Sequence, residues 1–309
     1  MSSTSRPALS VITPSFNHGR FLVDTIESIR KQTFTDYEYV VVDGGSSDNT
    51  VDILREYPWI NWRSEPDDGV LDAYRKAFQL TRGEYVIQCC VSDGFIDDRW
   101  FARCVEVLEA DPEVSLVWGL PQHMAEDGSM GPISYAEYLV NAPPQKQAFF
   151  PYWLVSGFFV PEGNYCVRRD VLMRCFPFDD QQTWRGQASP HLQFVFNFHR
   201  RGYLSWFLPT VANYGRTHAD QRTNKYEDTI ARDVCYYRAR ITALRRALAL
   251  GREFVTFRDG QNQPLNRFGR SQLLACPLWS TSRLLSRASS RLFRAMSGQN
   301  AKALSLFRA

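Results

Sequence analysis

The chain has 309 residues, 44% hydrophobic and 14% aromatic, enough to bury a sizeable core as one large domain or two ordinary ones. Its seven cysteines show no repeated spacing, which excludes a disulfide-stapled secreted scaffold and fits a reducing compartment. The net charge of +3 is unevenly distributed: residues 261–309 hold eight basic residues and no acidic one, leaving 28 basic and 33 acidic residues elsewhere.

The first 120 residues alternate short β-rich runs with helical spacing, which is typical of a parallel sheet with crossover helices. We therefore predict an α/β fold with a Rossmann-like, mostly parallel sheet flanked by helices. The predicted strands are residues 9–16, 37–44, 60–64, 85–90 and 115–120. The predicted helices are residues 19–32, a helix capped by Ser47 or Asp48 that runs to Tyr57, and residues 70–80 and 98–110.

Residues 121–165 are proline-rich and lack clear periodicity, so we interpret them as an irregular insertion around a functional site. Beyond this insertion, helical patterns return, with one strand between the last two of them. The predicted helices are residues 169–174, 191–201 and 228–250, and the strand is residues 203–214. The last of these helices predicts a C-terminal helical extension.

The tail from residue 261 places four arginines on one helical face and apolar residues mostly opposite, the pattern of a helix at a membrane interface. The arginines are Arg283, Arg287, Arg291 and Arg294. We found no signal peptide, and the most apolar stretch, residues 148–161, is too short to span a bilayer. We expect a cytoplasmic protein, soluble or peripheral on the inner face of the membrane, whose tail contacts an anionic surface.

Polar residues come after each of the first four predicted strands. They are Thr13-Pro14-Ser15, Asp43, residues 64–69 ("SEPDDG") and residues 91–94 ("VSDG"). In open parallel sheets the carboxyl ends of the strands share one edge, where ligands bind. Several carboxylates there need a compensating cation, and a divalent metal that carries a phosphate would supply it. Oxygen ligands suit Mg²⁺ or Mn²⁺, and we predict Asp93 as the first ligand.

Four stretches in order carry a family resemblance. They are residues 10–50 ("SVITPSF" to "SSDNT"), "SEPDDGVLDAYRKAF", "TRGEYVIQCCVSDG" and "NYCVRRDVL". Together they resemble the nucleotide-sugar-dependent glycosyltransferases of family 2, which have the GT-A fold. The likeness is close over residues 8–120 and loose over residues 150–220.

The resemblance implies a nucleotide site on the first strands. Thr13, Pro14 and Asp43 would hold the base and ribose, although Asp43 could instead only cap the next helix. Three acids of the "SEPDDGVLDA" stretch would lie beside the nucleotide: Glu65, Asp68 and Asp72. Arg75, at a position that often holds asparagine, would pair with a phosphate or would simply be a solvated helix residue.

The resemblance also implies a metal site. Ser92 and Asp93 occupy the place of the metal-binding acidic signature, and His218 matches a frequent second ligand, with a histidine of no role as the alternative. Arg216 and Arg222 flank that histidine and would neutralise a diphosphate. The chain departs from the family at Gly94, where a second acid is common, which puts metal affinity in doubt.

A second departure lies at residues 188–203. Relatives usually place a Glu-Asp pair there, with the aspartate as the general base, but this chain has Pro190 and His191. A histidine can act as a base near neutral pH, so His191 is one candidate. Asp179, Asp180 and Glu162 are the others.

The resemblance divides the chain into a glycosyltransferase domain, an extension and a tail. The predicted boundaries are 1–225 (nucleotide-binding half 1–120, acceptor half 121–225), 226–260 and 261–309. Aromatic residues in the insertion could line an acceptor groove or could be ordinary core: Phe149, Phe150, Tyr152, Trp153, Phe158 and Phe159. We assign no role to His18, His123 and His199.

The expected function is inverting sugar transfer from a nucleoside-diphosphate sugar, with UDP favoured, to a glycan or lipid-linked acceptor. A nucleotide-sugar-binding protein without transferase activity is the alternative, motivated by Gly94 and Pro190. No G-x-G-x-x-G comes after the first strand, which argues against a dehydrogenase. The acidic body and the lack of a recognised module argue against nucleic acid as a partner.

Overall fold

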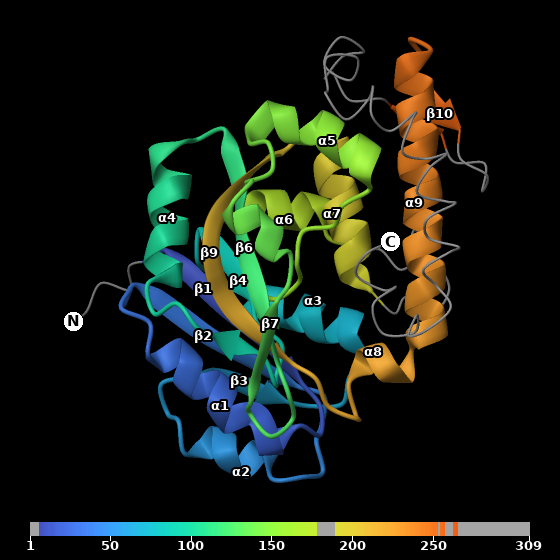
Figure 1. Ribbon diagram of the computed structural model, residues 1–309. Helices are drawn as coiled ribbons and strands as arrows, with labels where there is room; N and C mark the ends of the chain where they lie inside the picture. The colour runs from blue at the N-terminus through green and yellow to red at the C-terminus, as the bar shows by residue number, and fades with distance from the viewer. Residues whose placement is uncertain (1–5, 178–188, 253, 257–261, 265–309) are drawn as a thin grey trace.

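The computed structural model describes residues 6–177, 189–252, 254–256 and 262–264 (Figure 1). Within these residues, one nine-stranded sheet has the order β3-β2-β1-β4-β8-β6-β9-β5, with β7 paired to β6. Its strands are β1 (Leu9–Ser15), β2 (Tyr37–Asp43), β3 (Asn61–Ser64), β4 (Tyr85–Gln88), β5 (Gly94–Phe95), β6 (Val114–Met124), β7 (Met130–Ile133), β8 (Cys166–Arg168) and β9 (Leu204–Arg216). A separate two-stranded sheet pairs β10 (Phe254–Thr256) with β11 (Asn262–Pro264).

The helices cover both faces of the large sheet. They are α1 (Gly19–Arg30), α2 (Thr50–Arg55), α3 (Val70–Leu80), α4 (Trp100–Ala110), α5 (Phe149–Ser156), α6 (Arg169–Cys175), α7 (Pro190–Arg200), α8 (Arg222–Lys225) and α9 (Glu227–Ala249), with 3-10 turns η1 (Ala136–Leu139) and η2 (Lys146–Ala148). Alternate residues of a strand point to opposite faces, so Leu9 and Val11 of β1 pack with α1 and α4 while Ile12 packs with α3.

The first half of the sheet confirms the predicted alternation of strands and helices. β3, β2, β1 and β4 are all parallel. The α/β fold class is therefore confirmed. β8 then runs antiparallel to both β4 and β6, so the sheet becomes mixed in its second half. The sequence did not reveal β8, because a three-residue strand is too short to show a periodic pattern.

The insertion at residues 121–165 is more regular than predicted. β6 continues to Met124 and pairs in parallel with the long, curved β9 (Figure 1). Pro121 has no N–H to donate, but its carbonyl accepts from the Ser134 amide, so the strand passes through the proline. α5 lacked a predictive pattern because it is apolar on nearly all sides and mostly buried.

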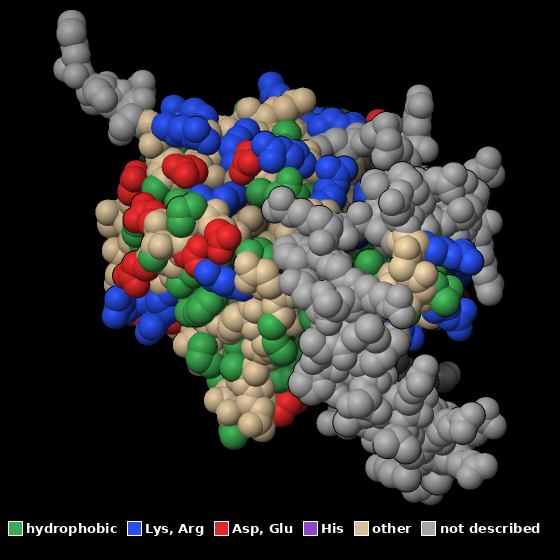
Figure 2. All heavy atoms as spheres, turned by 90° about the horizontal axis from the view of Figure 1, so that it is seen from above, with side chains coloured by type: hydrophobic (Ala, Val, Ile, Leu, Met, Phe, Trp, Pro, Cys, Tyr) green, Lys and Arg blue, Asp and Glu red, His purple; other side chains and the backbone are tan. Residues whose placement is uncertain are grey.

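α9 confirms the predicted helical extension. It stands along one side of the molecule, where it packs against α5 and α7 (Figure 1). Among the described residues, no helix combines the length and the apolar character needed to cross a membrane. Figure 2, which views the molecule from above, shows hydrophobic side chains in several patches among interspersed basic and acidic ones.

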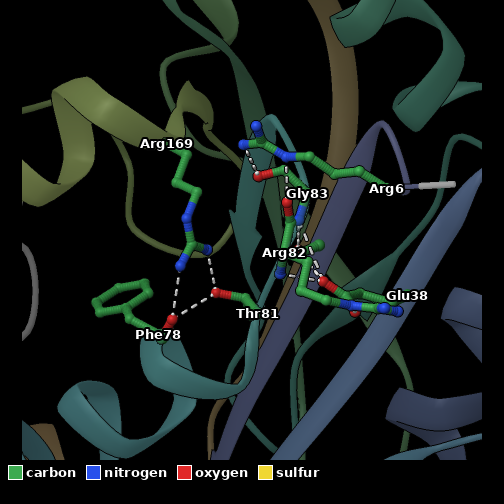
Figure 3. A network of polar contacts seen from close by, with 8 residues as sticks. Arg6, Glu38, Phe78, Thr81, Arg82, Gly83 and Arg169 are labelled. Atoms are coloured by element: carbon green, nitrogen blue, oxygen red, sulfur yellow. Dashed lines mark hydrogen bonds and ion pairs between the residues drawn. The ribbon is translucent and has the colours of Figure 1, made fainter. Parts of the chain in front are cut away.

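The amino ends of β1, β2 and β4 are tied together by a polar network (Figure 3). Glu38 accepts from the Ser10 hydroxyl at 2.7 Å, from the Gly83 amide at 3.1 Å and from the backbone and side chain of Arg82. The Arg6 guanidinium donates to the carbonyls of residues 82 and 83. Arg169 donates to the Phe78 carbonyl at 2.8 Å, which fixes α3 to the start of α6.

Candidate functional site

Three parallel strands end level with one another at the opposite edge of the sheet. Ser15 of β1 is in register with Asp43 of β2, which is in register with Ser64 of β3. The loops that leave these strands, and the loop after β4, therefore gather at one edge. This is the arrangement predicted from the strand-end residues.

Asp43 is fully buried, and its carboxylate is heavily hydrogen-bonded within the protein. Oδ2 accepts from the Gly45 amide at 3.2 Å, the Ser46 amide at 2.9 Å and the Ser64 hydroxyl at 2.7 Å. Oδ1 accepts from the Ser46 hydroxyl at 2.5 Å. Asp43 thus shapes the loop after β2, and one lone-pair position on Oδ1 is left for a ligand. Its predicted contact with a nucleobase stays a prediction.

The loop after β3 places Asp67 beside the end of β2. A Cβ added to Gly44 would lie 2.6 Å from Asp67 Oδ2, so that carboxylate occupies the space that a side chain at 44 would need. Burial raises the pKa of Asp67, and the carboxylates of Asp72 and Asp43 raise it further. The sequence analysis named Asp68 and not Asp67; the contact of Asp67 with Gly44 appears only in the folded chain.

The other predicted acids of this stretch surround Lys76, a cation that the sequence reasoning also missed. Its ammonium group lies 3.2 Å from Glu65 and 3.1 Å from Asp72 and donates to the Pro66 carbonyl at 2.8 Å. Partial burial raises the pKa of Asp72, but the hydrogen bonds from Lys76 and the Asp68 amide outweigh it and lower the pKa overall. Arg75 pairs with Asp72 at 3.3 Å.

The predicted residues of β1 face different ways. Thr13 is fully buried, and its hydroxyl accepts from the Tyr39 hydroxyl at 3.0 Å in the core below the edge. Pro14, the next residue along the strand, is partly exposed. Because successive side chains of a strand alternate, Pro14 is the better placed of the two to meet a ligand.

Asp93 is a partly buried carboxylate that accepts few hydrogen bonds to offset its burial. Its Oδ1 accepts from the Arg216 amide at 3.1 Å. Burial raises its pKa to about 7, and the negative charge of Glu162 adds to the shift, against the opposing effect of Arg216. Glu162 and Asp93 also both raise the pKa of Cys90, whereas Arg222 lowers it. The structure therefore brings Asp93, Glu162 and Arg222 into one neighbourhood.

The backbone around Asp93 is held in an unusual conformation. Ser92 has φ 87°, a left-handed value that is costly for a residue with a side chain. The Thr25 hydroxyl supports it by accepting from the Ser92 amide at 3.2 Å and donating to the Asp93 carbonyl at 2.7 Å. α1 therefore positions the Asp93 carboxylate.

Gly94 has no room for the second acid that is common in the family. A Cβ there would lie 2.4 Å from the Tyr214 hydroxyl and 2.6 Å from the Ser28 hydroxyl. Gly94 pairs with Tyr214 where β5 meets β9. The departure at this position is therefore a packing requirement of the chain.

His218 and Arg216 lie against α1. The His218 ring is buried, 4.8 Å from the ring of Phe21 and 5.3 Å from that of His18. Burial lowers its pKa, which favours the neutral form, and its Nδ1 has no hydrogen-bond partner among the described residues. The Arg216 guanidinium is bonded to Asp24 at 2.5 Å, so it is already paired within the protein.

His191 lies at the start of α7 and is buried. Its Nε2 lies 2.8 Å from the Val160 carbonyl oxygen. A carbonyl can only accept, so Nε2 carries the proton and Nδ1 of the neutral ring carries the lone pair. Nδ1 has no hydrogen-bond partner in the described part of the chain. The ring stacks on Tyr165 at 5.5 Å.

The segment from Val160 to Tyr165 links His191 to Asp93. His191 touches both ends of this segment, and a Cβ added to Gly163 would lie 3.5 Å from Asp93 Oδ2. Asn164 fixes the segment by donating to the Gly119 carbonyl and the Asn213 side chain, both at 3.0 Å. His191, Glu162 and Asp93 are therefore held by one short stretch of chain.

Two of the predicted bases, Asp179 and Asp180, lie outside the described residues. Of the predicted groove aromatics, Phe149, Phe150 and Trp153 are buried and belong to the core. Tyr152, Phe158 and Phe159 are only partly buried against that core.

Within the described residues, no group of three or more His, Cys, Asp and Glu side chains is arranged to hold a metal ion. Mg²⁺ and Mn²⁺ commonly take only one or two protein carboxylates and fill their other positions with phosphate oxygens and water. A desolvated carboxylate with a raised pKa, such as Asp93, fits that mode of binding.

The sequence matches a known protein family. Residues 10–176 match the family described as glycosyl transferase family 2. An uncharacterized glycosyltransferase of Mycobacterium tuberculosis is 33% identical over 162 residues, which cover 50% of this chain and 62% of that protein. The putative teichuronic acid biosynthesis glycosyltransferase TuaG of Bacillus subtilis is 34% identical over 134 residues, 40% of this chain and 50% of TuaG. The matched regions therefore span about half to three-fifths of these relatives.

Solved structures share the fold at low identity. S. aureus TarS 1–349 in complex with UDP-GlcNAc has a TM-score of 0.54 at 15% identity, covering 78% of this chain and 72% of that one. The mannosyltransferase of Pyrobaculum calidifontis in complex with GDP-Man and Mn²⁺ has a TM-score of 0.54 at 20% identity, covering 98% and 79%. These similarities establish the GT-A fold.

Proposed function

The chain belongs to glycosyl transferase family 2, and on that premise we propose that it is an inverting enzyme that transfers a sugar from a nucleoside-diphosphate sugar to a hydroxyl of a glycan or lipid-linked acceptor. TarS and the mannosyltransferase hold UDP-GlcNAc and GDP-Man respectively, which supports a nucleotide sugar as donor. UDP-sugars are our first choice of donor.

The observation that carries the proposal is the Asp93 carboxylate. It is desolvated, it lies near the Glu162 charge, and no cation pairs with it among the described side chains. Mg²⁺ or Mn²⁺ would be held by Asp93, with His218 as the second ligand predicted from the sequence. When bound, the metal would neutralise the departing diphosphate.

We assign the general base to His191. Nδ1 would take the proton of the acceptor hydroxyl. At the same time the hydroxyl oxygen would bond to the anomeric carbon of the sugar, and the bond from that carbon to the diphosphate oxygen would break. The hydrogen bond from Nε2 to Val160 would hold the ring in position throughout. Glu162, Asp179 and Asp180 are the alternatives to be tested beside it.

The test uses the purified full chain, Mn²⁺ and a panel of nucleoside-diphosphate sugars, with nucleotide release and the thermal midpoint as readouts. A donor that binds the folded state raises the midpoint. His191→Gln keeps an N–H group that can donate to the Val160 carbonyl, so the variant should fold and bind the nucleotide sugar. Its kcat should fall about 100-fold. If kcat is unchanged in His191→Gln but falls in Glu162→Gln or Asp180→Asn, the residue whose substitution lowers kcat is the general base.

Binding without turnover is the second candidate function. The observations that favour it are the missing acid at Gly94, which packing excludes, and Pro190 and His191 in place of an acidic pair. Donor-dependent stabilisation without nucleotide release, with water or any tested acceptor, would favour a nucleotide-sugar-binding partner subunit.

The predicted domain division stays a proposal, since the family match ends at residue 176. Apart from 262–264, the basic tail lies outside the described residues. Membrane contact through that tail is likewise proposed from sequence alone.

A further inference from the structure

A partly exposed aromatic cluster lies between η1, α5 and the segment directly after α5. It consists of Tyr135, Tyr138, Tyr152 and Phe158, each partly buried against the core. Tyr135 and Tyr138 stack at 5.9 Å, and Phe158 lies 5.2 Å and 5.8 Å from their ring centres. Aromatic faces of this kind suit the apolar face of a sugar ring.

The backbone at Tyr135 supports a functional role for the cluster. Its φ of 57° is left-handed, a conformation that a non-glycine residue adopts only at a cost of about 1 kcal/mol. Tyr135 lies at the start of the η1 turn, where its carbonyl accepts from the Tyr138 amide at 2.9 Å. In this turn the rings of Tyr135 and Tyr138 lie nearly parallel, with 9° between their planes.

Arg238 of α9 brings a positive charge to this cluster. A Cβ added to Gly157 would lie 3.9 Å from Arg238 Cγ, so the side chain lies over the end of α5, directly before Phe158. Burial raises the pKa of the Tyr135 phenol and the Glu137 carboxylate raises it further, whereas Arg238 lowers it. The guanidinium therefore lies near these rings, and so does the exposed Glu137 carboxylate, which also acts on Tyr138 and Tyr152.

The charge of Arg238 has no counterion among the described residues. The side chain is half-buried, its Nε is buried without a hydrogen-bond partner, and it forms no ion pair in the described part of the chain. Burial lowers its pKa, and the only groups that oppose this effect are the Cys235 thiol and the Tyr135 phenol, both ordinarily neutral. The buried Nε is withdrawn from water without a partner among the described residues, so an anionic ligand that accepts from it would be favoured.

The cluster is also within reach of the reaction centre. Phe158 is two residues before Val160, whose carbonyl holds His191, and five residues before Gly163, which lies beside Asp93. Five extended residues span at most about 18 Å. The cluster and the reaction centre are therefore no more than about 18 Å apart along this segment, which an oligosaccharide acceptor can span.

We propose that Arg238 and the Tyr135 cluster form an acceptor subsite for an anionic sugar, in which Arg238 pairs with the carboxylate or phosphate and the aromatic rings contact the sugar face. This inference rests on the proposed function, and it adds the charge class of the acceptor.

The test measures binding of three matched sugars to the full chain saturated with UDP and Mn²⁺. The sugars are methyl β-glucoside, methyl β-glucuronide and methyl β-glucoside 6-phosphate, which differ only at carbon 6. At least one anionic sugar should bind about 10-fold more tightly than the neutral one, as expected of a charge-assisted pair. The preferred anion distinguishes a uronic acid from a sugar phosphate.

Arg238→Met keeps the aliphatic stem and should abolish this preference, while binding of the neutral glucoside is unchanged. The matched control is Arg245→Met on the same helix, because that guanidinium already donates to the Val155 carbonyl at 3.3 Å; this variant should retain the preference. Tyr135→Gly removes the ring and should weaken all three sugars. Because the lost ring packing exceeds the relieved strain, its thermal midpoint should fall, and binding is measured below that midpoint.

Equal binding of the three sugars by the wild type, including no binding of any of them, overturns the inference. A preference that survives in Arg238→Met also overturns it. Donor binding and nucleotide release are measured in the same preparations. If they are normal while the charge preference is absent, only the subsite is wrong; if they are absent too, the proposed function fails.

Discussion

The charged groups at the amino edge of the sheet are satisfied within the protein. At the carboxyl edge Asp43, Glu65 and Asp72 are satisfied too, but two other groups are not. At the amino edge, the Glu38 carboxylate accepts from one hydroxyl and two amides, and Arg6 and Arg169 are hydrogen-bonded to carbonyls. At the carboxyl edge, Asp93 is desolvated near the negative charge of Glu162. The Nδ1 of His191 has no hydrogen-bond partner among the described residues. The strands are the same, so the difference lies in the loops attached to their two ends.

This contrast separates stability from function. Satisfied polar groups hold a fold together, whereas buried polar groups without partners lower stability unless a ligand completes them. Substitutions at the amino edge should therefore act on the free energy of unfolding, and those at the carboxyl edge on activity. Substitutions at both edges, and at one position away from them, test this division.

The largest effect is expected at Asp93. Asp93→Asn keeps an acceptor for the Arg216 amide but removes the charge, so kcat should fall at least about 100-fold. Its free energy of unfolding should equal or exceed that of the wild type, because no carboxylate is desolvated. Denaturant unfolding and nucleotide-release assays measure both, with the exposed Asp98→Asn as the control. A destabilised but active Asp93→Asn would contradict the division.

Next is Gly83, at the amino edge. An added Cβ would lie 2.5 Å from the Ser10 nitrogen and 2.6 Å from the Leu9 carbonyl carbon, both backbone atoms that cannot turn aside. Gly83→Ala should lower the free energy of unfolding by about 3 kcal/mol and leave kcat of the folded fraction intact. Gly215→Ala is the matched control: its nearest neighbour is Asp93 Oδ1 at 3.9 Å, so stability should hold within about 0.5 kcal/mol.

His199 belongs to neither edge and tests stability alone. Burial among aromatic rings lowers its pKa to about 3. The unfolded chain takes up a proton below about pH 6.5 and the folded chain does not, so stability present at neutral pH is lost as pH falls. The contribution of His199 to this loss should reach about 2 kcal/mol between about pH 6.5 and 5, at about 1.4 kcal/mol per unit. Asp93, whose pKa is raised to about 7, gives the opposite slope over this range, so the test is the difference between wild type and variant. Chemical unfolding at several pH values should show the contribution of His199 removed in His199→Phe.

The smallest effect is expected from Glu38→Gln. The amide retains one acceptor oxygen but loses the charge-assisted bonds to Arg82, so the free energy of unfolding should fall by about 1 kcal/mol. Steady-state kinetics should be unchanged. An inactive Glu38→Gln of normal stability would mean that the two edges are coupled.

The sequence was most informative where the pattern is local. The alternation of apolar strands and amphipathic helices predicted β1 to α4, and the polar residues after the strands predicted that the strand ends would lie together. The register of Ser15, Asp43 and Ser64 confirms that these strand ends lie side by side. Such features depend on residues within one element.

Features that depend on distant partners could not be predicted. Asp67 and Asp68 are adjacent and alike in sequence, and only the fold shows which one fills the space beside Gly44. The bond of His191 to Val160 and the lone charge of Arg238 among the described residues likewise arise from segments that meet only in three dimensions. The short β8 was not predicted because only its pairing with β4 and β6 identifies it as a strand.

The contact between Gly94 and Tyr214 has a consequence for sequence divergence. The tyrosine hydroxyl takes the volume that any side chain at position 94 would fill, although 120 residues separate the two. A homologue that carries an acid at the first position needs a smaller or differently oriented side chain at the second. Positions 94 and 214 should therefore co-vary. Introducing a second carboxylate at position 94 would first require a smaller residue in place of Tyr214.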